Sequence, residues 1–238
     1  MTTKSISVSP SPEVIEKARS IYKILESVFG LPEIREPLPA IDELISTILS
    51  QNTNDTNRDH AYNNLRAKFP TWKRVIDAPT EEVIEAIRVA GLANQKGPRI
   101  QSILKQISIE RGDLSLNFLR DMEKDEAVNW LMQHKGVGPK TAAIVLQFSL
   151  GIPAFPVDTH VHRVSGRLGI RPIQLNAEQT HTWMERIFDP GQYGPGHLNL
   201  IKLGRKICHA RNPECPVCPI NHLCDYYSNL QRTNSSKN

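Results

Sequence analysis

Four cysteines crowded into one short segment constrain this 238-residue chain more than any other feature. They are Cys208, Cys215, Cys218 and Cys224, and the 207 residues before them contain no cysteine. A disulfide framework distributes its cysteines so that they can join distant parts of a chain. Four thiols within 17 residues instead indicate four ligands of one metal centre, and this segment must then fold around that centre.

The spacing of the cysteines, C-x6-C-x2-C-x5-C, favours an iron–sulfur cluster over zinc. Centres with four thiolate ligands hold either zinc or iron with sulfide. Structural zinc usually takes two short C-x2–4-C pairs, and only Cys215 and Cys218 form one here. The wider spacings suit ligands that surround several iron atoms. The sequence therefore predicts a [4Fe–4S] cluster, with zinc as the alternative.

The composition is that of a globular protein, and its surplus positive charge lies in one part of the chain. Hydrophobic residues make up 39 % and charged residues 23 %, which is ordinary for a folded domain. Residues 1–139 contain 18 basic and 19 acidic side chains, whereas residues 140–238 contain 11 and 6. A local surplus of this kind is typical of proteins that bind polyanions, although a solvated basic surface would look the same.

The sequence contains no segment suited to a membrane or to secretion. The longest apolar stretch, at 142–150, is interrupted by Gln147 and Ser149, and a membrane helix needs about 20 apolar residues. Residues 1–12 lack the apolar core of a secretory signal. We therefore expect an intracellular protein, in the cytoplasm or nucleoid, with no membrane partner.

Helical patterns dominate the chain. Ile41, Leu44, Ile45, Ile48 and Leu49 mark one apolar face of a helix. A second helix is expected to be capped by the threonine at position 80 and to end near position 91. Further helices are expected at 11–29, 56–67, 98–110, 124–134, 179–188 and 197–208. Because alternating strand patterns are nearly absent, we predict an all-α protein.

A glycine-rich turn separates two of the expected helices. Gly136 and Gly138 permit positive φ and a close approach of the backbone to a partner. Pro139 suits the first position of the following helix, because it has no N–H that would be left unpaired there. A helix-hairpin-helix turn of this kind points backbone amides at an anion such as a DNA phosphate, and it does so without reading base sequence.

Lys140 and Asp158 are the candidate catalytic pair. Lys140 directly follows the turn, and Asp158 precedes another expected helix in the segment FPVDTHV at 155–161. An amine and a carboxylate that converge on one site can act as nucleophile and base. The alternatives are a lysine that only binds phosphate and an aspartate that only caps its helix.

Three motifs together resemble those of the endonuclease III family of DNA glycosylases, in the helix-hairpin-helix Gly/Pro-Asp superfamily. They are GVGPKTA at 136–142, VDTHV at 157–161 and the four-cysteine loop. All three occur in the order and at the intervals of that family, and the resemblance extends from about Glu13 to Cys224.

The resemblance implies two α-helical lobes that flank a DNA-binding cleft. One lobe, at 39–151, would be a six-helix barrel that contains the hairpin. The other, at 13–38 together with 152–227, would carry the [4Fe–4S] cluster. Residues 1–12 and 228–238 are expected to be disordered tails. Lys140 and Asp158 would lie on opposite walls of the cleft.

The resemblance also implies a bifunctional DNA glycosylase and abasic-site lyase that acts as a monomer on double-stranded DNA. The substrate would be a flipped damaged base, with oxidised pyrimidines expected, or an abasic site. Lys140 would attack C1′ of the sugar as a neutral amine, and Asp158 would help to deprotonate it. A lysine suits this role because it forms an imine and because desolvation lowers its pKa. The resulting Schiff base permits β-elimination, which nicks the strand.

The resemblance assigns DNA contacts to two groups of residues before Lys140. A polar residue of the family fills the gap left by the flipped base, and Asn52 stands at its usual glutamine position, with Gln51 beside it. Leu92 matches the apolar wedge of the family. The hairpin residues Lys135, Gly136, Val137 and Gly138 would contact phosphate. As the alternative, the segments around Asn52 and Leu92 are plain helix ends.

A third group of expected DNA contacts is basic and lies beside the cysteines. Lys202, Arg205 and Lys206 share a helix face that enters the first cysteine, and Arg211 lies between the first two cysteines. These positions match the phosphate-contacting loop of the family. A solvated basic face is the alternative.

Two other functions stay open at this point. The first is a glycosylase of the same superfamily that acts on mismatched thymine or uracil, because Asn52 departs from the usual glutamine. The second is a non-catalytic helix-hairpin-helix DNA-binding module with a metal-stabilised tail. The presence of both Lys140 and Asp158 at the family's positions argues against this module.

Overall fold

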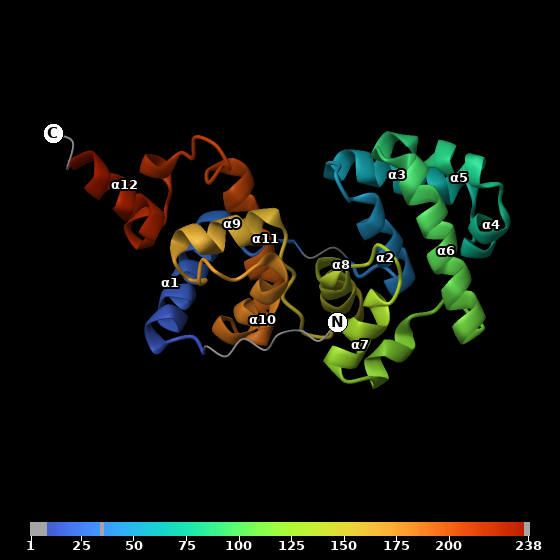
Figure 1. Ribbon diagram of the computed structural model, residues 1–238, viewed down its shortest axis with the longest axis horizontal. Helices are drawn as coiled ribbons and strands as arrows, with labels where there is room; N and C mark the ends of the chain where they lie inside the picture. Colours follow the sequence, from blue (N-terminus) through green and yellow to red (C-terminus); the bar gives the residue numbers. More distant parts are fainter. Residues whose placement is uncertain (1–8, 34–35, 236–238) are drawn as a thin grey trace. The chain divides into compact units, whose positions relative to one another are not determined.

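The computed structural model describes residues 9–33 and 36–235, and these residues form helices and loops with no β-strand. The predicted all-α class is confirmed. Twelve α-helices occur among the described residues, labelled in Figure 1. The chain divides into two compact units, Glu36–Ile152 and Met1–Arg35 with Pro153–Asn238. These boundaries lie within three residues of the lobes expected from the sequence.

The unit Glu36–Ile152 is built around one buried helix, α2 (Ala40–Leu49). All five residues of its predicted apolar face are at most 5 % exposed, and α3, α6 and α8 pack around it. The α-helices that follow α2 in this unit are α3 (Asp55–Lys68), α4 (Trp72–Asp77), α5 (Thr80–Ala86), α6 (Ala93–Arg111), α7 (Lys124–Met132) and α8 (Pro139–Ile144). Two 3-10 segments, η1 (Arg88–Ala90) and η2 (Asn117–Asp121), and a π-helical segment, η3 (Val145–Leu150), complete it.

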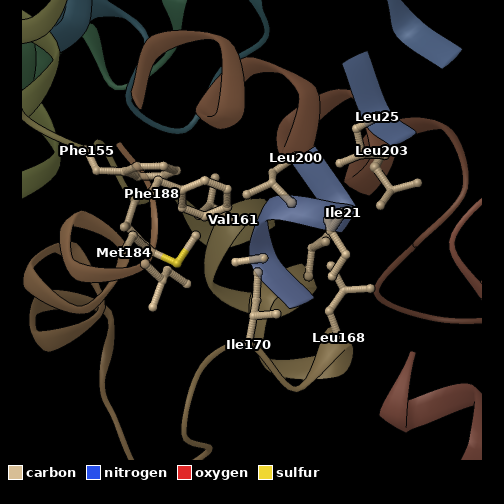
Figure 2. Close-up of a cluster of buried hydrophobic side chains, with 14 of the residues drawn as sticks. Ile21, Leu25, Phe155, Val161, Leu168, Ile170, Met184, Phe188, Leu200 and Leu203 are labelled. Atoms are coloured by element: carbon tan, nitrogen blue, oxygen red, sulfur yellow. The ribbon is translucent and has the colours of Figure 1, made fainter. Parts of the chain in front are cut away.

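The other unit joins the two ends of the chain. It contains α1 (Pro12–Phe29), α9 (Thr159–Leu168), α10 (Ala177–Ile187), α11 (Tyr193–Lys206) and α12 (Asp225–Ser235). Short 3-10 segments lie at η4 (Pro190–Gln192), η5 (Cys215–Val217) and η6 (Asn221–Leu223). Ile21 and Leu25 of α1 enter a core with Leu168 of α9 and Leu200 and Leu203 of α11 (Figure 2). The N-terminal helix is therefore part of the same core as the cysteine segment.

Several expected boundaries differ from the structure, including the two that follow. Thr80 does not cap α5: Pro79 occupies the cap position, and the Thr80 hydroxyl donates to Gln101 Oε1 at 2.8 Å. Residues 228–235, expected to belong to a disordered tail, form most of α12. Residues 9–12 of the other expected tail are described and lead directly into α1, whereas 1–8 and 236–238 lie outside the described residues.

Candidate active site

The predicted hairpin between α7 and α8 is present. Gly136 has φ +91°, and a Cβ at this position would overlap the Arg99 side chain. The Val137 N–H donates to the His134 carbonyl at 3.0 Å, and the Val137 side chain is buried. Gly138 has φ −106°, so it does not use the positive φ that glycine permits. Its extended backbone is the ordinary conformation of a residue that precedes a helix.

Lys140 is the second residue of α8, directly after Pro139 at the first position. Its side chain is half-buried, and the three residues that follow it, at 141–143, are buried against the unit. Since α8 packs on the central helix α2, the backbone of Lys140 stands on a rigid element. Such elements hold reactive groups more accurately than free loops do.

Asp158 caps the N-terminus of α9. Its Oδ1 accepts a hydrogen bond from the Val161 N–H at 2.7 Å. Phe155 and Pro156 lie shortly before Asp158 in the chain, and side chains of α10 and α11 hold their backbone in place. Glu185 accepts from the Phe155 N–H at 3.2 Å, His181 Nδ1 lies 2.9 Å from the Phe155 carbonyl oxygen, and His197 Nδ1 lies 2.8 Å from that of Pro156. Asp158 is half-buried and belongs to the other unit from Lys140.

Gln51 and Asn52 follow α2 and have different surroundings. Gln51 Nε2 donates to the Gly136 carbonyl at 3.1 Å, and its Oε1 accepts from Arg99 Nη1 at 3.0 Å. Asn52 is exposed and has φ +54°, a left-handed conformation that asparagine tolerates better than most residues. Gln51 is thus held against the hairpin, and Asn52 is presented to solvent.

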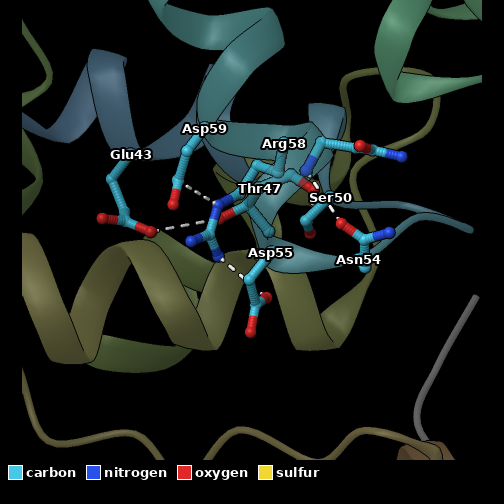
Figure 3. Close-up of polar contacts among 8 residues, drawn as sticks. Glu43, Thr47, Ser50, Asn54, Asp55, Arg58 and Asp59 are labelled. Atoms are coloured by element: carbon cyan, nitrogen blue, oxygen red, sulfur yellow. Dashed lines mark hydrogen bonds and ion pairs between the residues drawn. The ribbon is translucent and has the colours of Figure 1, made fainter.

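Polar contacts stabilise both ends of the connection between α2 and α3, which carries Gln51 and Asn52 (Figure 3). The Ser50 hydroxyl donates to the Thr47 carbonyl at 2.7 Å at the end of α2. Asn54 caps α3 by accepting from the Asn57 N–H at 2.8 Å. Arg58 pairs with the carboxylates next to it in α3, at positions 55 and 59. These local bonds fix both ends of the short connection that carries Gln51 and Asn52.

Leu92 also adopts a left-handed conformation, with φ +51°, and precedes α6. Its side chain is 45 % exposed. A leucine in this region of backbone space costs roughly 1 kcal/mol or more. An exposed apolar side chain held at this cost is what the expected wedge role requires, and such strain concentrates at functional sites.

The four cysteines line one cavity, together with Arg167, Leu203 and Tyr226. Cys224 is buried in the core of its unit, and Cys208, Cys215 and Cys218 are half-buried. Within the described residues, no three His, Cys, Asp or Glu side chains are gathered closely enough to hold one metal ion. The thiols surround a cavity, and four thiolates around such a space are the donor set of a polynuclear iron–sulfur cluster.

Two arginines of α9 fix the start of the cysteine segment. Arg163 donates to the carbonyls of Gly204 and Cys208, at 2.9 and 3.0 Å. Arg167 Nη1 donates to the His209 carbonyl at 2.6 Å and lies 3.4 Å from Cys208 Sγ. Burial raises the pKa of the thiols at 215, 218 and 224, so ligation has to displace their protons.

The basic residues beside the cysteines do not form one uniform face. Arg205, Lys206 and Arg211 are exposed. Lys202 instead donates to the Phe29 carbonyl at 3.1 Å, and its ammonium lies 5.0 Å from the centre of the Phe29 ring. Lys202 was expected to share one exposed basic face with the other three residues. This expectation is wrong, because the Lys202 ammonium is hydrogen-bonded to the end of α1.

Sequence reasoning missed Lys96 and Arg99 of α6. Lys96 is 1 % exposed and donates to the last carbonyls of α2 and η1, whereas Arg99 is half-buried and donates to Gln51. Burial, together with the nearby Arg99 charge, lowers the pKa of Lys96 to about 8. A lysine in sequence is by default an exposed residue, so nothing in the pattern distinguishes Lys96 from its solvated counterparts.

Comparison with known proteins identifies the family. The profile of the "HhH-GPD superfamily base excision DNA repair protein" matches residues 45–190, and that of the "iron-sulfur binding domain of endonuclease III" matches 208–224. The chain is 33 % identical to endonuclease III of Thermotoga maritima, over 77 % of this chain and 82 % of that protein. It is 34 % identical to endonuclease III of Sulfolobus acidocaldarius, over 77 % and 81 %.

A protein of Arabidopsis thaliana named as a DNA glycosylase is 40 % identical over 61 % of this chain, which spans half the length of that relative. Among solved structures, a non-covalent endonuclease III–DNA complex superimposes with a TM-score of 0.79 at 30 % identity, covering 92 % of this chain and 98 % of that chain. A trapped endonuclease III–DNA covalent intermediate gives 0.78, also at 30 % identity, over 91 % and 98 %.

The all-α fold agrees with these matches. The protein accordingly holds a [4Fe–4S] cluster, and the matched segment 208–224 contains the four cysteines. The chain belongs to the endonuclease III family of the HhH-GPD superfamily of base excision DNA repair proteins.

Proposed function

We propose that Lys140 and Asp158 carry the DNA glycosylase and AP lyase activity of this chain, with oxidised pyrimidines as the damaged bases. One observation carries the assignment: Lys140 stands half-buried at the second position of α8, directly after the turn of a helix-hairpin-helix. The family relationship supports the same positions. A solved structure of endonuclease III contains a trapped covalent intermediate with DNA, which supports a covalent mechanism.

The reaction begins with a nucleotide flipped out of the duplex, because a stacked base cannot reach an enzyme pocket. The neutral Nζ of Lys140 attacks C1′ while the bond from C1′ to the base breaks. The base leaves with the electron pair of that bond and takes up a proton. Asp158 accepts a proton from Nζ and stabilises positive charge on the sugar.

The lyase step follows from the same covalent bond. The bond from C1′ to the ring oxygen O4′ breaks, O4′ takes up a proton, and the nitrogen electron pair forms a protonated imine between Nζ and C1′. Loss of a proton from C2′ then expels the 3′ phosphate, which cuts the strand 3′ to the lesion. The protein needs no further nucleophile, because one lysine serves both bond-breaking steps.

Several groups position the DNA in this proposal. Gly136 and Lys135 of the hairpin, with Arg205, Lys206 and Arg211, bind phosphates, a contact that fixes register without reading sequence. Asn52 fills the gap left by the flipped base, and Leu92 acts as the apolar wedge. We assign the [4Fe–4S] cluster a structural role: its four thiolate ligands hold the loop that carries Arg211.

The enzyme acts on double-stranded DNA as a monomer, and its substrate places it inside the cell. None of the helices in the described part of the chain is both long and apolar enough to cross a membrane.

End-labelled duplexes that differ only at one base test the lesion class. They carry thymine glycol, a T·G mismatch, uracil or no damage. The proposal predicts that the thymine glycol strand is cut without alkali, whereas the mismatched and undamaged strands stay intact. Processing of the mismatched thymine alone would favour the other candidate function, a glycosylase for mismatched thymine or uracil. The asparagine at position 52 is the observation that supports this candidate. No processing of any damaged duplex would contradict the glycosylase assignment.

A further inference from the structure

Lys96 is buried in the interior of the unit Glu36–Ile152, although lysine is one of the residues least often found there. Its ammonium donates to the Leu49 carbonyl at 2.7 Å and to the Ala90 carbonyl at 2.9 Å. Leu49 is the last residue of α2, and Ala90 is the last residue of η1. One charged group thus joins the C-terminal ends of two helical segments that are about 40 residues apart in sequence.

The two carbonyls explain why a cation occupies this position. The last carbonyls of a helix have no partner within the helix, and a positive charge is favourable at that end. An apolar side chain of equal size would leave the carbonyls of Leu49 and Ala90 buried without this donor, which is unfavourable. The hydrogen bonds therefore offset part of the desolvation cost of the Lys96 charge, and the rest lowers its pKa.

Each of these carbonyls lies just before a left-handed residue that is exposed to solvent. Asn52, with φ +54°, is three residues beyond Leu49, and Leu92, with φ +51°, is two residues beyond Ala90. Lys96 consequently fixes the starting points of both loops with one group. The two exposed side chains are those assigned above to the gap and to the wedge.

Arg99, one turn further along α6, extends the connection to the hairpin. Its Nη1 donates to Gln51 Oε1 at 3.0 Å, and Gln51 Nε2 donates to the Gly136 carbonyl at 3.1 Å. The Arg99 side chain also covers Gly136 so closely that a Cβ there would overlap it. Helix α6 thereby contacts the loop after α2, the loop after η1 and the hairpin turn.

We propose that Lys96 is a positioning residue for base flipping, which holds the loops of Asn52 and Leu92 in one arrangement while Arg99 connects them to the phosphate-binding hairpin. The proposal rests on the proposed function, because it takes these loops as the DNA-contacting surface. Flipping costs free energy, and side chains that enter the duplex stabilise the flipped state only if little ordering is needed when they bind.

Lys96→Met tests the proposal, because methionine preserves the unbranched apolar stem and removes the ammonium. Lys105→Met, an exposed lysine of the same helix, is the matched control. Iron content and melting temperature establish how much of each variant is folded. Single-turnover rates are then measured per folded protein on a duplex with thymine glycol and on a duplex with a ready-made abasic site.

Base excision should fall by about 100-fold in Lys96→Met, a loss typical of misplaced substrate-contacting groups. Cleavage at the abasic site should fall by less than about fivefold, because a site without its base is the least costly to flip. Lys105→Met should match the wild type in both assays. Equal losses in the two assays would overturn the proposal, since a merely structural role lowers both alike.

Amide hydrogen exchange of the DNA-free protein tests the positioning role of Lys96 independently of the proposed glycosylase activity. Lys96→Met should increase amide exchange at residues 50–54 and 90–92 together, because opening of either loop no longer has to break a shared contact. Unchanged exchange at both loops would overturn the proposal even if the enzyme is active. A wild type with no activity on any damaged DNA would overturn the function while leaving this loop coupling intact.

Arg99→Met provides a second route if Lys96→Met does not fold with its iron. Arg99 is half-buried, so its replacement leaves the core intact. This variant should increase exchange at 51–54 and at 135–138, with a larger loss in base excision than in abasic-site cleavage. Wild-type exchange and wild-type excision in this variant would overturn the proposed connection through α6.

Discussion

At the residue scale, sequence alone does not separate the structural role of a side chain from its proposed role in catalysis or DNA binding. Asp158 caps α9 and is also the residue that we propose as the catalytic base. Gln51 and Asn52 are adjacent in sequence, yet only Asn52 is exposed, because Gln51 bonds to Arg99 and to the Gly136 carbonyl. The family resemblance pointed to both residues, whereas only the hydrogen bonds of the folded unit distinguish the surroundings of Gln51 from those of Asn52.

Asp158→Asn separates capping from chemistry. Asparagine is as good an N-cap as aspartate, so the free energy of unfolding should change by less than about 1 kcal/mol. Base excision should fall by about 100-fold or more, because an amide cannot accept the proton from Lys140. Urea unfolding and single-turnover assays measure the two effects. Wild-type excision by Asp158→Asn would reduce Asp158 to a capping residue.

Lys96 should make stability depend on pH in alkaline solution. Burial, followed by the charge of Arg99, lowers its pKa to about 8 from an ordinary value of 10.5. Below pH 8 the folded protein carries the full cost of the buried charge. Between pH 8 and 10.5 the unfolded chain binds more protons than the folded protein, so stability rises with pH by at most about 1.4 kcal/mol per unit.

The comparison with Lys96→Met isolates this effect. The free energy of unfolding of the wild type minus that of the variant should increase from pH 7.5 to pH 9.5, as measured by urea unfolding at each pH. A difference that stays constant over this range would show that the ammonium keeps an ordinary pKa in the folded protein.

The buried Lys96 also shows what sequence could not reveal at this scale. Lysine residues at 96 and 105 occupy the same helix and look alike in the pattern of residues. Only the packing of Leu49 and Ala90 around α6 makes Lys96 an interior residue. Lys202 differs from Arg205 for the same kind of reason, because the end of α1 reaches it from about 170 positions away in sequence.

At the scale of elements, periodicity predicted the helices well and their ends less well. The apolar face of α2 is buried as expected. Helix α6 begins at Ala93, five residues before its expected start at Pro98, and contains that proline. Proline is favoured in the first turn of a helix, so the sequence pattern suggested too late a start. No residue pattern predicted that residues 145–150 would continue α8 as a π-helix.

The two hairpin glycines provide a matched test of the turn. Gly136→Ala should lower stability by about 2 kcal/mol, because alanine is strained at φ +91° and its Cβ would overlap Arg99. Gly138→Ala should cost less than about 1 kcal/mol, since its φ of −106° is allowed and no atom lies within 4 Å of the added Cβ. Urea unfolding of both variants checks this order. Equal costs would contradict the assigned turn geometry.

At the scale of the whole molecule, the chain forms two units, and each carries one member of the proposed catalytic pair. The family resemblance, and not the hydrophobic pattern, was the source of the expected lobes at 39–151 and at 13–38 with 152–227. The cysteine segment joins α11 to α12 and shares the core of α1. The cluster should therefore stabilise one unit and leave the other unchanged.

Cys215→Ser tests this separation, because it removes one ligand that is not part of the buried core. Iron content should fall, and amide exchange should increase at 208–235 and in α9, whose arginines hold the segment. Exchange in α2 and α6 should match the wild type. A uniform increase along the chain would show that the cluster stabilises both units.

The central claim is that the amine of Lys140 forms a covalent bond with the sugar. Borohydride trapping on a duplex with one abasic site tests it most directly, with wild type and Lys140→Ala compared at equal iron content. We expect a covalent protein–DNA adduct in the wild type, its loss in Lys140→Ala, and attachment to Lys140 when the trapped peptide is sequenced by mass spectrometry. An adduct of equal yield in Lys140→Ala, or none from folded, iron-loaded wild type, would contradict it.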